Sequence, residues 1–126
     1  MNRIITSIVL IGLSCFLAIF GYFNLKSICE DEIINVKEII TAIEETDDDK
    51  IKKAVENTTA FWNKKNKLMG IYINHSEMDE IQINIKSLDD LCKSKDYEEL
   101  LEISYNSIYH LEHIGETENP SIGNIF

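Results

Sequence analysis

The chain has 126 residues and a formal net charge of −10 at pH 7, which suits one domain of ordinary size. This acidic balance argues against nucleic acid as a partner, and against anionic lipid headgroups, because like charges repel. Three cysteines are too few for a disulfide framework.

An uncharged apolar run extends from Ile4 to Leu25, close to the N-terminus. About 22 helical residues rise ~33 Å, enough to cross a hydrocarbon core of ~30 Å. We therefore predict that residues 1–26 form a membrane anchor and that residues 4–25 lie in the membrane.

A cleaved signal peptide is the main alternative for this run. Such a peptide has an apolar region of about 7–15 residues followed by small residues at the cleavage site. The run is longer than that, and Ala18-Ile19-Phe20 is a poor cleavage site because Phe20 is too large. A lipoprotein signal at Cys15 is disfavoured, because Gly12 and Leu13 stand in the wrong order before it. The anchor is therefore expected to be retained.

Basic residues near the two ends of a membrane helix set its orientation. Arg3 precedes the run, whereas Lys26 and Lys37 follow it, so the count is nearly balanced. The short N-terminal tail therefore decides the expected orientation, since a first apolar segment usually carries the chain that follows it across the membrane. We expect a single-pass protein of the cell membrane with a cytoplasmic N-terminus and an extracytoplasmic domain.

Apolar side chains after the anchor recur in steps of three and four, the spacing of one helical face. No glycine or proline separates Gly21 from the first of these stripes, so the first helix should continue the membrane helix as one rod. Strand signals are absent. We predict an all-α fold in which a transmembrane helix continues into an up-down-up-down four-helix bundle over 27–115. Its helices are expected at about 27–45, 47–72, 77–93 and 97–114, followed by a tail over 116–126.

Polar residues before three of these stripes are the expected N-caps: Thr46, Ser76 and Asp96. Gly115 is expected to end the last helix. The tail carries Ile122, Ile125 and Phe126, and it is expected to fold back on the membrane-proximal end of the bundle.

Trp62 lies on the apolar stripe of the second helix and is predicted to be a core residue. Cys29 starts the first soluble helix and Cys92 ends the third, so the topology places them at opposite ends of the bundle. A helix of ~17 residues is ~25 Å long. A disulfide needs Cα atoms within ~7 Å, so these two cysteines are not expected to pair.

The same topology gathers His75, His110 and His113 at the membrane-proximal end. His110 and His113 have the i, i+3 spacing that some metal sites use, although a zinc site needs three or four converging ligands. Both histidines point away from the core on a helical wheel. Exposed histidines are therefore the favoured interpretation and metal ligands the alternative, and no cofactor is predicted.

Motifs for catalysis are missing: there is no Gly-x-Ser-x-Gly elbow, no glycine-rich phosphate loop and no His-Glu-x-x-His. The adjacent acids Glu98-Glu99 and Asp89-Asp90 diverge on a helix. The sequence does not predict an enzyme.

The apolar anchor with an acidic helix after it, the segment from His75 to Ile81 and the ending from His113 to Phe126 together resemble a known family. It is the uncharacterised bacterial family called domain of unknown function 4363, small membrane-anchored proteins of low-GC bacteria. The resemblance implies no activity. It groups five residues as a candidate functional set: His75, Asp79, His113, Glu118 and Asn124.

These observations favour a membrane-anchored interaction or accessory module for another membrane protein. The alternative is a bundle that senses a ligand or a metal through its membrane-proximal histidines.

Overall fold

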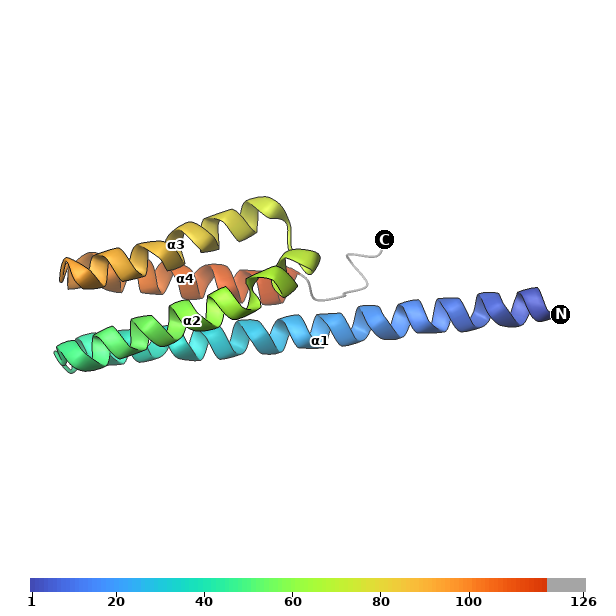
Figure 1. Cartoon of the computed structure of the whole chain (residues 1–126), viewed down its shortest axis with the longest axis horizontal. Helices are drawn as coiled ribbons and strands as arrows, with labels where there is room; N and C mark the ends of the chain where they lie inside the picture. Colours follow the sequence, from blue (N-terminus) through green and yellow to red (C-terminus); the bar gives the residue numbers. More distant parts are fainter. Residues whose placement is uncertain (118–126) are drawn as a thin grey trace.

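The computed structural model describes the backbone of residues 1–117 and the side chains of residues 1–114 (Figure 1). This part of the chain is helical throughout, with three short connections and no strand. The all-α fold predicted from the sequence is thereby confirmed. The proposed tail contacts, together with Glu118 and Asn124, lie outside the described residues. The helices are α1 (Asn2–Glu44), α2 (Asp48–Tyr72), α3 (His75–Lys93) and α4 (Tyr97–Thr117).

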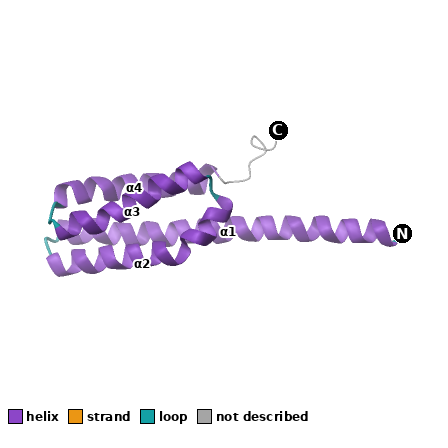
Figure 2. Cartoon of the chain, turned by 45° about the horizontal axis from the view of Figure 1, so that its top comes forward, coloured by secondary structure: helices purple, strands orange, loops and turns teal. Residues whose placement is uncertain are grey.

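Helix α1 is a single uninterrupted rod of 43 residues. Every residue from 1 to 20 is exposed, and the first buried position is Gly21. From there Leu25, Ile28 and later residues are covered by other helices. The N-terminal half of α1 accordingly projects beyond the bundle in both side views (Figures 1 and 2). The predicted continuation of the long apolar N-terminal helix into the bundle is confirmed.

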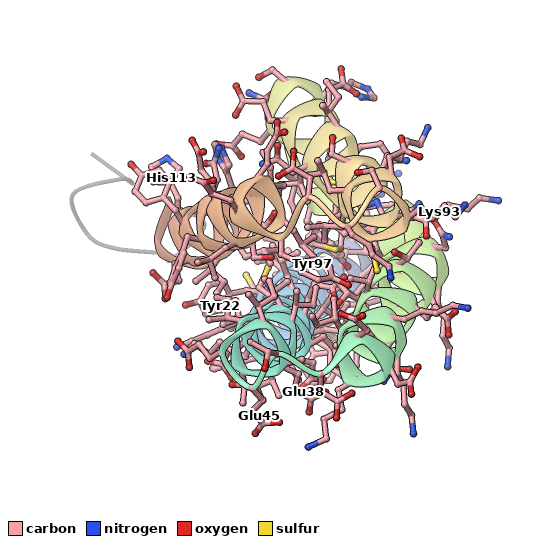
Figure 3. All side chains as sticks on the ribbon, turned by 90° about the vertical axis from the view of Figure 1, so that its left-hand side faces the viewer. Tyr22, Glu38, Glu45, Lys93, Tyr97 and His113 are labelled. Atoms are coloured by element: carbon pink, nitrogen blue, oxygen red, sulfur yellow. The ribbon has the colours of Figure 1, made fainter. Side chains whose placement is uncertain are left out.

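The four helices run up, down, up and down. Helix α1 packs against α2 and α4, and α3 packs against the same two helices. The phenol of Tyr97 donates a hydrogen bond to Oδ1 of Asp48 at 2.7 Å, which ties the α3–α4 connection to the α1–α2 connection. We call this the distal end. The proximal end is the one where α1 enters the bundle at Gly21. Figure 3 looks along the bundle and shows Tyr97 between the helices, with Glu45 and Lys93 on the outside.

The core is formed by large apolar side chains from all four helices, each worth about 1.5–3 kcal/mol when fully buried. Trp62 is buried among them, and its indole N–H donates to Oε1 of Gln82 on α3. The prediction that Trp62 is a core residue is confirmed. Other fully buried members are Ile39, Ile51, Ile81, Ile85, Leu88, Leu100 and Leu111.

The predicted caps differ from the observed ones at two of three helix starts. Thr46 has φ 53° and closes the end of α1, with its N–H bonded to the carbonyl of Ile43 at 3.0 Å. It therefore does not take the extended conformation of an N-cap, and Asp47 caps α2 instead by accepting from the Lys50 N–H at 3.2 Å.

Helix α3 begins at His75, two residues earlier than the sequence predicted, because Asn74 is its N-cap in place of Ser76. The Asn74 side chain accepts from the N–H of Ser76 at 2.8 Å. Asp96 accepts from the N–H of Glu99 at 3.3 Å, as predicted. Helix α4 continues through Gly115 to Thr117, so the predicted end at Gly115 is wrong.

The cysteines are free and far apart in the fold. Cys29 is buried on α1 about two turns past Gly21, whereas Cys92 is half-buried near the end of α3, at the distal end. The topology therefore excludes a bond between Cys29 and Cys92 within one chain.

Candidate functional site

The three histidines lie at the proximal end, as the sequence predicted. His75 begins α3 and is exposed, and His113 is exposed near the end of α4. His110 is half-buried, and its Nδ1 lies 3.6 Å from Oε2 of Glu80 on α3. Helix packing thus pairs His110 with a residue that the sequence analysis did not connect to it.

A cleft of about 220 Å³ lies between the start of α3 and the end of α4. Imidazoles and carboxylates face each other across it. Its lining includes His113 but neither His75 nor Asp79, so the structure does not bring these three members of the family-derived set together in one cleft. The lining residues are Glu77, Glu80, Ile81, Tyr109, His110, His113 and Ile114.

A metal ion needs several ligands converging on one point. Within the part of the chain that the structure describes, no three histidine, cysteine, aspartate or glutamate side chains converge in this way. The observed geometry of the proximal histidines therefore gives the metal-sensing alternative no support.

One exposed face of α4 is aromatic. Tyr105 and Tyr109 are 54% and 65% exposed and follow each other at i, i+4. His113 comes four residues later, and its ring stacks on Tyr109 with centroids 6.3 Å apart. We call these three residues the α4 aromatic face. Figure 3 shows His113 on the outer side of α4. The spacing of Tyr105, Tyr109 and His113 was the available signal for this stripe, which was not among the sites predicted from the sequence.

Glu32 is the second feature that the sequence analysis missed. It is 0% exposed, its Oε1 accepts from Nδ2 of Asn35 at 3.3 Å, and its Oε2 has no hydrogen-bond partner. Burial raises the pKa of its carboxyl to about 8, against a smaller lowering by Asn35. Spacing was the available signal, since Glu32 lies three residues after Cys29 and four before Val36, on the buried stripe itself.

Hydroxyl groups accompany Glu32 in the interior. Thr58, Ser104 and Ser107 are all buried, and each donates to the carbonyl four residues earlier in its own helix, at 2.7–2.9 Å. None of these three bonds reaches an imidazole, so these hydroxyls are not arranged as nucleophiles beside a base.

The distal end carries a larger cleft of about 450 Å³ that includes Cys92 and Tyr97. Two of its lysines form ion pairs, Lys93 with Asp89 at 3.0 Å and Lys95 with Asp48 at 3.7 Å. Burial and the neighbouring Asp89 raise the pKa of the Cys92 thiol, which makes it less nucleophilic.

Comparison with known proteins places the chain in a family but not in a functional class. No curated protein and no solved structure matches it. The family model called domain of unknown function, DUF4363, matches residues 19–125. That match begins two residues before Gly21, the first buried position of α1. It covers the whole helical bundle, and the resemblance seen in the sequence is confirmed: the chain belongs to the DUF4363 family.

Proposed function

We propose that the chain is a single-pass membrane protein whose bundle is an accessory module that binds another membrane protein. The observation that carries the proposal is the continuity of α1. Its first nineteen residues, 2–20, are exposed and mostly apolar, and the helix is long and apolar enough to cross a membrane, while from Gly21 onward it is packed into the bundle. A partner in the same membrane is thereby held beside a rigid domain.

The α4 aromatic face is the surface that we assign to this partner. Tyrosine is enriched in the centres of protein interfaces, because its ring supplies a large contact area and its hydroxyl a hydrogen bond. Tyr105 and Tyr109 project from a helix that is fixed by the core through Leu100, Ser104 and Leu111. Acidic residues flank this face at Glu102 and Glu112, which suits a partner with basic groups around an apolar centre.

In the proposed orientation the N-terminus is cytoplasmic and the bundle is extracytoplasmic. The intact mass of the protein extracted from membranes should include the complete N-terminus, whereas a form that starts after Gly21 would contradict the proposed anchor. Protease added to intact cells should cleave the bundle in this orientation and spare it in the opposite one.

Affinity purification of the full chain from mildly solubilised membranes tests the partner. The double variant Tyr105→Ala/Tyr109→Ala should lose a membrane protein that co-purifies with the unaltered chain. Ile83→Ala is the matched control, because Ile83 is an exposed apolar residue on α3, away from this face. Equal recovery with all three chains would exclude the α4 aromatic face as the binding surface.

A further inference from the structure

We propose that the last turns of α2 rest on the membrane surface, with Ile71 at the edge of the hydrocarbon and Lys64 and Lys67 against the phosphates of anionic lipids. This inference rests on the proposed membrane anchoring of α1. It adds a second contact between the protein and the bilayer, made by the bundle itself.

The level of α2 relative to the membrane follows from one contact. Residues 4–20, the uncharged part of α1 that is exposed, rise ~26 Å, close to the ~30 Å thickness of a hydrocarbon core. Gly21 and Leu25 are buried in the bundle, so the membrane boundary falls near Gly21 and not at Leu25 as the sequence predicted. The ring of Tyr72 lies against Gly21. The end of α2 is therefore at the same depth as the boundary, and both side views show it reaching farther along α1 than the visible end of α4 (Figures 1 and 2).

Large apolar side chains are exposed at this level. Ile71 is 72% exposed and Phe23 is 62% exposed, although Met69 and Ile73 beside Ile71 are buried. A single exposed apolar residue is ordinary on a protein surface. Here Phe23 and Ile71 extend the apolar surface of the anchor onto the first turn of the bundle, on two different helices. Lipid is the environment that covers the rest of that surface in the proposed arrangement.

The charge of α2 changes sign toward this end. From Asn57 to Tyr72 the helix has three lysines and no acidic residue, in a chain with 22 acidic residues. Lys64, Lys67 and Ile71 are all exposed and follow each other in steps of three and four, so they share one face. Lys67 and Lys64 lie ~6 Å and ~10 Å above Ile71 along the helix axis.

That spacing matches the layering of a lipid leaflet. An apolar side chain at the boundary with lysines above it lets their long stems lie along the surface and their ammonium groups meet phosphate. The net negative charge of the chain opposes contact with anionic lipid, and Glu77 and Glu80 carry that charge at the start of α3. Lys64 and Lys67 make this one face of α2 locally positive, so it is the side of the bundle that anionic lipid attracts.

Site-directed spin labelling of the full chain in phosphatidylcholine vesicles containing phosphatidylglycerol tests the contact. A nitroxide amino acid at position 71 should collide more with oxygen, which concentrates in lipid, than with a water-soluble nickel complex. The same label at position 83 should do the reverse, because Ile83 is 64% exposed in the middle of α3. A label at position 71 that is as accessible to nickel as the one at 83, or shielded from both reagents, overturns the proposal.

A label at position 13 separates this inference from the proposed anchoring. If a label at position 13 is more accessible to the nickel complex than to oxygen, the anchor itself is not in the membrane and both proposals fail. If the label at position 13 is more accessible to oxygen while the label at position 71 is more accessible to nickel, anchoring stands and only the membrane contact of α2 is overturned.

The lysines are tested by lipid composition. Lys64→Gln/Lys67→Gln should make the label at position 71 shallower in vesicles with phosphatidylglycerol and leave it unchanged in pure phosphatidylcholine. The matched control is Lys52→Gln/Lys53→Gln, which removes two exposed lysines from the distal half of α2. An equal shift for both pairs, or none for either, contradicts the assigned role of Lys64 and Lys67.

Discussion

The phenol ring of Tyr72 occupies the space that a side chain on Gly21 would fill. A Cβ atom on Gly21 would lie 2.6 Å from Cε1 of Tyr72 and 2.7 Å from its hydroxyl oxygen. The two residues are 51 positions apart in the sequence, at the point where α1 enters the bundle and α2 leaves it. Glycine here allows α2 to close on α1 at the base of the bundle.

Alanine at Gly21 should show this contact in a double-mutant cycle. Glycine within a helix costs about 1 kcal/mol relative to alanine, so relief of that cost stabilises the protein unless the new methyl group collides. Gly21→Ala displaces the Tyr72 ring and should gain little, whereas in a Tyr72→Ala background it should gain roughly 0.5–1 kcal/mol in the free energy of unfolding. Chemical denaturation of the full chain in micelles measures all four corners of the cycle.

Gly70→Ala is the matched control for this cycle, since no atom lies within 4 Å of the Cβ position at Gly70. It should stabilise the protein whether or not Tyr72 is present. If Gly21→Ala stabilises as much as Gly70→Ala with Tyr72 in place, the ring does not depend on Gly21.

Trp62 should be a large contributor to stability. Replacement of a buried aromatic residue by alanine typically costs about 3–5 kcal/mol, which is a large share of the stability of a small domain. Trp62→Phe keeps most of the packing but leaves Oε1 of Gln82 without its indole donor, and it should cost roughly 1–3 kcal/mol. Thermal unfolding followed by circular dichroism measures both. Ile83→Ala, at an exposed position, is the control and should change stability by less than about 0.5 kcal/mol. A Trp62→Ala protein with the same melting temperature as Ile83→Ala would be evidence against a buried Trp62.

Sequence patterns were sufficient to predict the four helices and their buried faces, but not the residues at which the helices begin and end. A stripe such as Ile81, Ile85 and Leu88 predicts which face is buried, because the helical period alone determines it. Helix starts depend instead on competition between neighbouring polar residues. Thr46 and Asp47 can both cap a helix, and Asp47 does so because Thr46 is used to end α1.

The features of the candidate site were harder to predict for a related reason. The contact between His110 and Glu80 joins two helices, and a wheel drawn for one helix has no information on the register of the next. Glu32 was missed because apolar character was taken as the mark of a core position, although its spacing from Cys29 and Val36 was that of a buried residue.

Cys29 and Cys92 should differ in their reactivity. Burial raises the pKa of the Cys29 thiol to about 12, with smaller contributions from the carboxyls of Glu30 and Glu32. The thiolate is the reactive form of a cysteine. The pKa of the Cys92 thiol is raised as well, but this side chain is partly exposed, so a maleimide should label Cys92 slowly in the folded protein and Cys29 only after denaturation. Mass spectrometry of digests after timed labelling measures both rates. A Cys29–Cys92 peptide from oxidised monomer, or equal labelling rates in the folded protein, would contradict the antiparallel topology or the burial of Cys29.

Glu32 should make the stability of the bundle depend on pH. Its folded-state pKa of about 8 lies above the ordinary value of about 4.3 for glutamate, so the folded protein retains a proton that the unfolded chain has lost. Stability is therefore greatest below the ordinary pKa and decreases as the pH rises from there through about 8.

Glu32→Gln replaces the carboxyl by a neutral amide of the same size and should remove this dependence. Near pH 4–5 the two proteins should unfold at similar denaturant concentrations, because the folded-state carboxyl is protonated and the unfolded one partly so. Above pH about 8 the variant should be more stable by up to about 5 kcal/mol, since the pKa difference is roughly 3.7 and each unit corresponds to about 1.4 kcal/mol. Denaturation of both proteins across this range gives the difference directly. Glu38→Gln, an exposed substitution on the same helix, leaves Glu32 in place and should keep the loss of stability between about pH 5 and about 8 that Glu32 causes. Parallel curves for Glu32→Gln and the unaltered protein would show that Glu32 ionises as freely in the folded bundle as in the unfolded chain, and the carboxyl would then have access to water.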